Sequence, residues 1–105
     1  MDARELRRLL LETGMEVHYG HFTGDHPMPY LTYREVGTRD MSADNRALVR
    51  TRRWDIDLYT RGKQPEASAK VEALLDAHGI RFSATEYEAA DGAFLQTVYE
   101  VRLMA

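Results

Sequence analysis

The chain contains no cysteine among its 105 residues. This absence excludes disulfides, thiolate metal sites and a thiol nucleophile. The longest apolar runs are three residues, as in Leu9-Leu10-Leu11; since such runs are far too short to span a bilayer, we expect no membrane partner. Cations are fewer than acids, with 14 lysines and arginines against 17 aspartates and glutamates, so the formal net charge is −3. A nucleic-acid-binding domain is normally basic overall, and this balance argues against that class.

Apolar periodicity divides the chain into helices and strands. Leu6, Leu9 and Leu10 form one helical stripe between Asp2, a potential N-cap, and Gly14, a helix stop. At this length we expect one domain, residues 1–105. Helices are predicted over residues 2–13 and 65–78, strands over 15–19, 30–36, 46–60, 81–88 and 93–103, and polar loops over 20–29 and 37–45.

The order of these elements predicts the fold class. No strand–helix–strand unit repeats, so a doubly wound parallel sheet is disfavoured. Trp54 and Leu58 share one face of the longest predicted strand, while Asp55 and Asp57 share the other. One covered and one solvated face is typical of antiparallel sheets. We therefore predict an α+β fold with two layers, in which a mainly antiparallel sheet carries two helices on one face.

Charge is distributed unevenly along the chain. Residues 46–63 hold six cations and two acids, a net charge of +4, whereas residues 66–105 hold three cations and seven acids, a net charge of −4. Complementary blocks of this kind can join copies of one chain head to tail. This pattern is typical of an oligomerising structural component.

Three groups of residues are candidates for chemical sites. His18, His21, Asp25 and His26 fall within nine residues, but their Pro- and Gly-rich loop lacks the ordered spacing of structural zinc sites, so a solvated loop is favoured. His78 fits the negative end of the preceding helix without any catalytic role.

The other candidate is a pair of carboxylates. Asp55 and Asp57 point to the same face of one strand, beside Arg53. A surface charge ladder is favoured over a catalytic pair. Since no phosphate-binding loop, dinucleotide fingerprint or nucleophile elbow occurs in the chain, we expect neither an enzyme nor a cofactor.

One pattern extends over nearly the whole chain, about residues 5 to 103. It comprises Pro29-Tyr30-Leu31-Thr32-Tyr33, then Ala43-Asp44-Asn45, then Ile56-Asp57-Leu58-Tyr59-Thr60, and finally Val98-Tyr99-Glu100-Val101. In these motifs the chain resembles the small head–tail completion proteins of long-tailed bacteriophages and prophages, of the tail-terminator or tail-to-head joining kind.

The resemblance implies a structural protein of the virion, made in the bacterial host cytoplasm. It implies a homo-oligomeric ring, a hexamer, that caps the phage tail-tube protein and then contacts the head-connector or stopper protein. DNA would pass through the lumen without sequence recognition.

Within this interpretation, the 37–45 loop and the 46–53 segment project toward the ring axis or the next subunit. We expect the loop to be mobile in the free subunit, and the acidic region 66–91 to be the counter-surface. Another phage neck protein (a stopper), a non-phage α+β interaction module and a small enzyme using the histidine cluster remain as alternatives. The candidate interface residues are Arg39, Asp40, Met41, Asp44, Asn45, Arg46, Arg50, Arg52 and Arg53.

Overall fold

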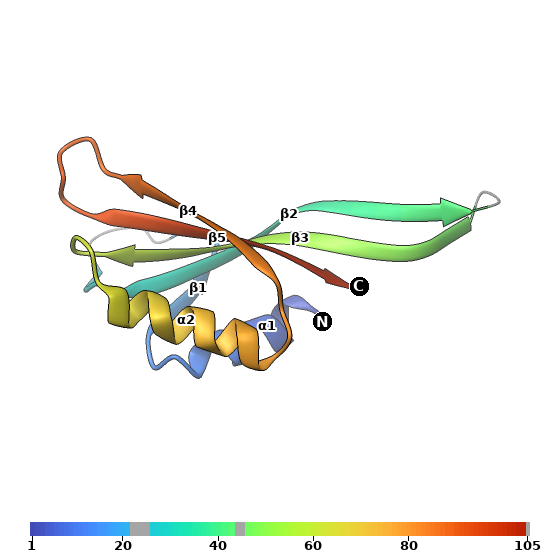
Figure 1. Cartoon of the computed structure of the whole chain (residues 1–105), viewed down its shortest axis with the longest axis horizontal. Helices are drawn as coiled ribbons and strands as arrows, with labels where there is room; N and C mark the ends of the chain where they lie inside the picture. The colour runs from blue at the N-terminus through green and yellow to red at the C-terminus, as the bar shows by residue number, and fades with distance from the viewer. Residues whose placement is uncertain (22–25, 44–45, 105) are drawn as a thin grey trace.

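The computed structural model describes residues 1–21, 26–43 and 46–104. It contains one five-stranded sheet, in the order β1-β2-β3-β5-β4, and two helices (Figure 1). The predicted α+β class is confirmed. In chain order the elements are α1 (Ala3–Leu11), β1 (Glu16–Tyr19), β2 (Tyr30–Ala43), β3 (Arg46–Thr60), α2 (Pro65–Ala77), β4 (Phe82–Glu88) and β5 (Leu95–Met104).

The sheet is antiparallel except at one edge. β3 is central and pairs antiparallel with β2 and with β5, and β4 pairs antiparallel with β5. The four residues of β1 run parallel to the start of β2, from Glu16 opposite Tyr30 to Tyr19 opposite Tyr33. The prediction of a mainly antiparallel sheet is therefore confirmed.

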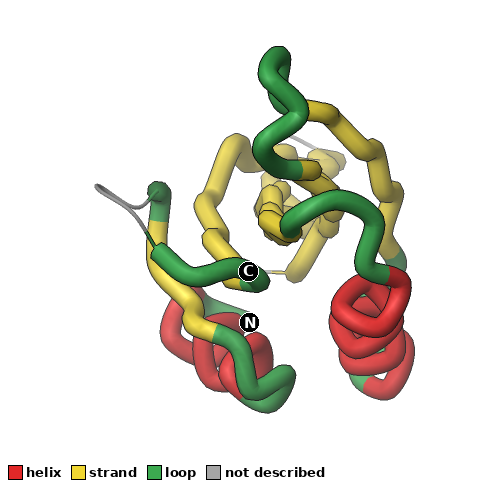
Figure 2. Tube along the Cα trace, turned by 90° about the vertical axis from the view of Figure 1, so that its left-hand side faces the viewer, coloured by secondary structure: helices red, strands yellow, loops and turns green. Residues whose placement is uncertain are grey.

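Both helices cover the same face of the sheet, as predicted (Figure 2). Asp2 caps α1, because its side chain accepts a hydrogen bond of 2.8 Å from the backbone N–H of Glu5. Pro65 opens α2, where its missing N–H costs nothing. The apolar stripes of the two helices meet the inner side chains of the sheet in one core. That core consists of Leu6, Leu9, Leu10, Val17, Leu31, Tyr33, Trp54, Ile56, Leu58, Ala67, Val71, Leu75, Ile80, Tyr99, Val101 and Leu103.

The predicted loop over residues 37–45 is wrong for most of its length. Residues 37–43 belong to β2 and pair with the first residues of β3, from Thr38 opposite Arg52 to Ala43 opposite Arg46. Cross-strand pairing overrides the turn-forming tendency of residues such as Gly37 and Ser42, because strand propensity depends strongly on context. The expectation that this segment is mobile in the free subunit stays a prediction, and its last two residues, 44 and 45, lie outside the described part of the chain.

The described part of the chain contains no helix that is long and apolar enough to cross a membrane.

Candidate functional site

A two-stranded projection dominates one end of the molecule (Figure 1). β2 and β3 stay paired as far as Ala43 and Arg46, whereas β5 accompanies β3 only from Thr51 onward. Residues 40–43 and 46–50 therefore extend beyond the end of β5, and together with residues 37–39 at their base we call them the hairpin arm. With the arm included, the molecule measures 51 × 28 × 22 Å along its principal axes.

The local sequence determines where the arm begins. Trp54 is buried, whereas residues 51–53 before it are half-buried and Arg50 is exposed. Between the pairs Glu35–Trp54 and Gly37–Arg53, β2 has a bulge at Val36. Such bulges bend a strand and increase its twist. The arm thus leaves the core where the apolar alternation of β3 ends.

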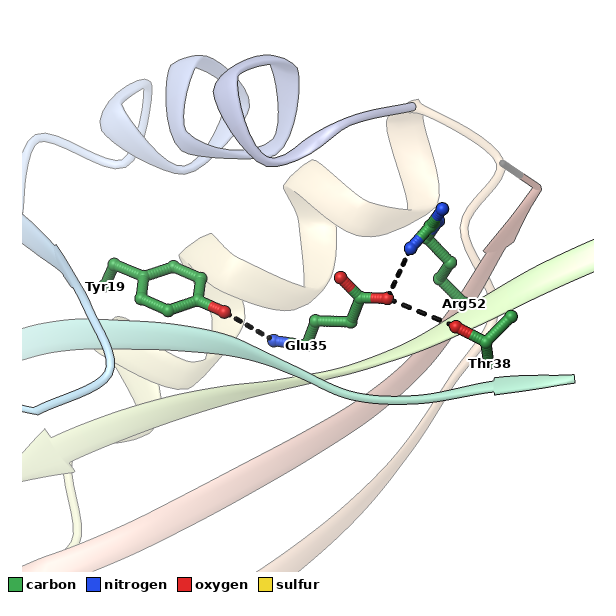
Figure 3. A network of polar contacts seen from close by, with 4 residues as sticks. All are labelled: Tyr19, Glu35, Thr38 and Arg52. Atoms are coloured by element: carbon green, nitrogen blue, oxygen red, sulfur yellow. Dashed lines mark hydrogen bonds and ion pairs between the residues drawn. The ribbon is translucent and has the colours of Figure 1, made fainter.

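A polar network fixes the base of the arm (Figure 3). The Glu35 carboxylate accepts hydrogen bonds from Arg52 Nη1 at 2.7 Å and from the Thr38 hydroxyl at 3.3 Å. The backbone N–H of Glu35 donates to the Tyr19 hydroxyl at 3.4 Å. Since both charged groups are only partly exposed, this ion pair is less screened than one in open solvent. The network ties β1, β2 and β3 together where the arm leaves the sheet.

At the base of the hairpin arm, Arg52 and Arg53 lie on opposite faces of the sheet. Arg52 lies on the same face of β3 as Trp54, which is the face that the helices cover. It borders an open hollow of about 420 Å³ against the start of α1. Arg53 lies on the other face, with Nε 3.6 Å from the Glu100 carboxylate and 3.9 Å from that of Asp55.

The structure brings the predicted interface segments together as the two strands of the arm. Arg39 lies opposite Thr51, and Asp40 lies opposite Arg50, which is exposed. Arg39, Asp40, Met41 and Arg46 are placed here by their backbone pairing alone, and Asp44 and Asn45 lie outside the described residues.

The helix-free face of the sheet differs from the prediction at its centre. Asp55 and Asp57 were expected in a solvated charge ladder, but they are only 9% and 7% exposed. Burial, followed by the charge of Asp55, raises the pKa of Asp57, and the positive charge of Arg34 partly offsets the shift. One carboxylate oxygen of each aspartate has no hydrogen-bond partner. The alternation of residues along the strand did not reveal the burial of these aspartates, because short side chains on a central strand are covered by larger neighbours from distant parts of the chain.

Aromatic rings flank these carboxylates. Tyr30 and Tyr59 stack with a centroid distance of 4.8 Å, and Phe94 lies 5.8 Å from Tyr59. Burial raises the pKa of Tyr59, and the negative charge of Asp57 adds to the shift. The helix-free face is therefore partly apolar and does not form an open charged surface.

The histidine positions do not converge on a chemical site in the described chain. His18 and His26 have ring centroids 6.0 Å apart, and His26 Nδ1 lies 3.9 Å from the Glu16 carboxylate. Among the described residues no three histidine, aspartate or glutamate side chains come together to hold a metal ion, and Asp25 lies outside them. His78 follows α2, with Nε2 3.6 Å from the Glu12 carboxylate.

The chain has an α+β fold with an extended hairpin. No protein-family model matches the chain, and no curated protein sequence matches it significantly. The fold is similar to that of a chain in a solved structure described as the virion of a native gene transfer agent particle. The alignment has a TM-score of 0.62 and 20% sequence identity, and it covers 99% of this chain and 87% of that one. Such coverage includes the hairpin arm as well as the core.

Proposed function

We propose that this chain is a structural subunit of a phage-like virion, and that copies of it form a ring that terminates the tail tube and joins the tail to the head connector. The fold similarity to a chain of a gene transfer agent virion supports the virion role, since it extends over 99% of this chain. The sequence resemblance to tail-terminator and tail-to-head joining proteins supports the more specific role.

The observation that carries the proposal is the hairpin arm. A two-stranded ribbon is marginally stable in water unless it packs against something else. Over residues 40–43 and 46–50 the described chain supplies no third strand, so a neighbouring protein is the natural partner. Arg52 and Glu35 orient the arm at its base, which favours a fixed contact over a free tether.

A ring also suits the charge of the chain. In the ring, DNA passes through the lumen without being read. A formal net charge of −3 suits this passage, because tight phosphate contacts would hold the DNA in place. A ring requires a heterologous contact, in which one surface of each copy meets a different surface of the next.

Deleting the coding sequence in a particle-producing strain tests the role. A terminator is required to finish tails, so we expect DNA-filled heads without attached tails, together with tails of uncontrolled length. Plasmid-borne wild-type protein should restore joined particles.

Two other outcomes would contradict the proposal. Finished tails beside heads that have lost their DNA would indicate a stopper, because a stopper closes the head. Normal particles in normal numbers would indicate an interaction module outside the virion.

A further inference from the structure

β4 presents a strand edge that no other strand of the described chain pairs with. Its seven residues pair with β5 on one side in an unbroken register, and no strand of the described chain pairs with its other side. Natural edge strands are commonly protected by lysine, proline or a bulge. β4 contains no lysine, proline or bulge, and its charged residues are Glu88 and Glu86, whose carboxylate lies 2.6 Å from Lys63 Nζ. From Ser83 to Glu88 every residue is exposed. An edge of this kind is suited to pairing with another strand.

The hairpin arm presents the second free edge. β1 ends its pairing with β2 at Tyr33, and the Tyr19 hydroxyl occupies the N–H of Glu35. From residue 36 to residue 43, no strand of the described chain lies on the outer side of β2. The two free edges have similar lengths, and they lie on opposite sides of the sheet because β3 and β5 separate them.

The two edges carry opposite charge. β4 contains two acids, Glu86 and Glu88, and no lysine or arginine, whereas residues 37–43 and 46–50 of the hairpin arm contain three arginines and one acid. Glu88 and Tyr87 are exposed at the end of β4, and 56% of Tyr87 is accessible. Electrostatic attraction and one accessible aromatic ring therefore favour contact between the arm of one copy and β4 of another.

We propose that the outer edge of β2 in the hairpin arm of one copy pairs with β4 of the next copy, so that adjacent copies share a continuous sheet. The inference rests on the proposed ring and names the two surfaces that close it. Strand addition of this kind obtains its affinity from main-chain hydrogen bonds. Repeated around a closed ring, it leaves neither edge unpaired.

Disulfide trapping in particles tests this pairing, since the chain has no cysteine of its own. The trapping pairs combine Val36→Cys or Thr38→Cys on β2 with Ala84→Cys or Tyr87→Cys on β4, so that both strand faces are sampled. Within one copy the two strands are three strand spacings apart, roughly 14 Å, which exceeds the ~7 Å that a disulfide can bridge. Any disulfide must therefore join two copies.

Purified particles carrying each pair are oxidised and analysed on non-reducing gels. We expect a ladder of covalent multimers for at least one pair, which collapses to the single chain on reduction. The control combines Thr38→Cys with Ala73→Cys, an exposed position on α2, and should give no ladder.

Charge reversal provides an independent measurement. Glu88→Lys on the β4 edge should lower the yield of joined particles at least tenfold, whereas Asp76→Lys, the same charge change on α2, should leave it within twofold. Particles that contain rings but give no ladder for any of the four pairs would overturn the strand pairing alone. Particles without any ring of this chain would overturn the proposed function and the pairing together.

Discussion

Truncation of Trp54 tests how the helices and sheet form one core. Trp54 is 2% exposed, and its ring lies 6.2 Å from that of Tyr33 and 6.5 Å from that of Tyr19. Trp54→Ala removes this burial and leaves a cavity, which costs about 3–5 kcal/mol for large aromatic side chains. Because small domains are stable by only about 5–15 kcal/mol, this loss is a large part of the total. At about 4–8 °C per kcal/mol, the thermal midpoint should fall by at least about 12 °C.

Chemical denaturation followed by far-ultraviolet circular dichroism measures the effect, since the variant lacks the only tryptophan of the chain. The matched control is Trp54→Phe. It retains an aromatic ring and removes the indole N–H, which has no hydrogen-bond partner in the described structure. Its cost should be less than half that of Trp54→Ala. A Trp54→Ala midpoint equal to that of the parent, with an unchanged denaturant slope, would refute the core arrangement.

Three further predictions concern the arm, the buried carboxylates and assembly. Residues 39–51 can be replaced by Asn-Gly, a two-residue turn suited to the Thr38–Arg52 pair. This replacement should change the free energy of unfolding by less than about 1 kcal/mol but abolish tail attachment in a complementation assay. Tail attachment by the variant without the arm would contradict the role of the arm. The pKa of Asp57 is raised above its ordinary value of 3.8, so the folded state binds more protons than the unfolded state. The free energy of unfolding should therefore fall as pH rises from 3.8 through the pKa of the folded state. In denaturation curves, Asp57→Asn should show a weaker dependence of this free energy on pH in that range and no loss of stability at pH 7. Oligomers of the concentrated protein should dissociate as salt rises from roughly 0.05 to 0.5 M in light scattering, and a mass independent of salt would exclude charge pairing between copies.

Local patterns predicted most of the secondary structure because they report local physics. The stripe of Leu6, Leu9 and Leu10 predicted α1, and the sequence Asp91-Gly92 between the predicted strands 81–88 and 93–103 is typical of a β-hairpin turn. There the Asp91 carboxylate accepts a hydrogen bond of 3.0 Å from the N–H of Ala93, and Gly92 adopts a φ of 72° that favours glycine. Such signals depend only on residues close together in the sequence.

The features that define the candidate site are not local. Residues 46–50 of the arm belong to the predicted strand 46–60, whereas residues 37–43 were predicted as a loop because Gly37 and Ser42 are turn formers, and their strand conformation comes from pairing with β3. The burial of Asp55 and Asp57 depends on neighbouring strands that come from distant parts of the chain. The charge contrast between residues 46–63 and 66–105 could be found in the sequence, but the free edge of β4 emerged only with the strand order.

Cryo-electron microscopy of intact particles tests the central claim most directly. The account predicts a ring at the joint between tail tube and head connector, into which copies of this fold fit with each hairpin arm lying along β4 of the next copy. A ring at that joint built from a different fold, with this chain located elsewhere or missing from the particle, would contradict it.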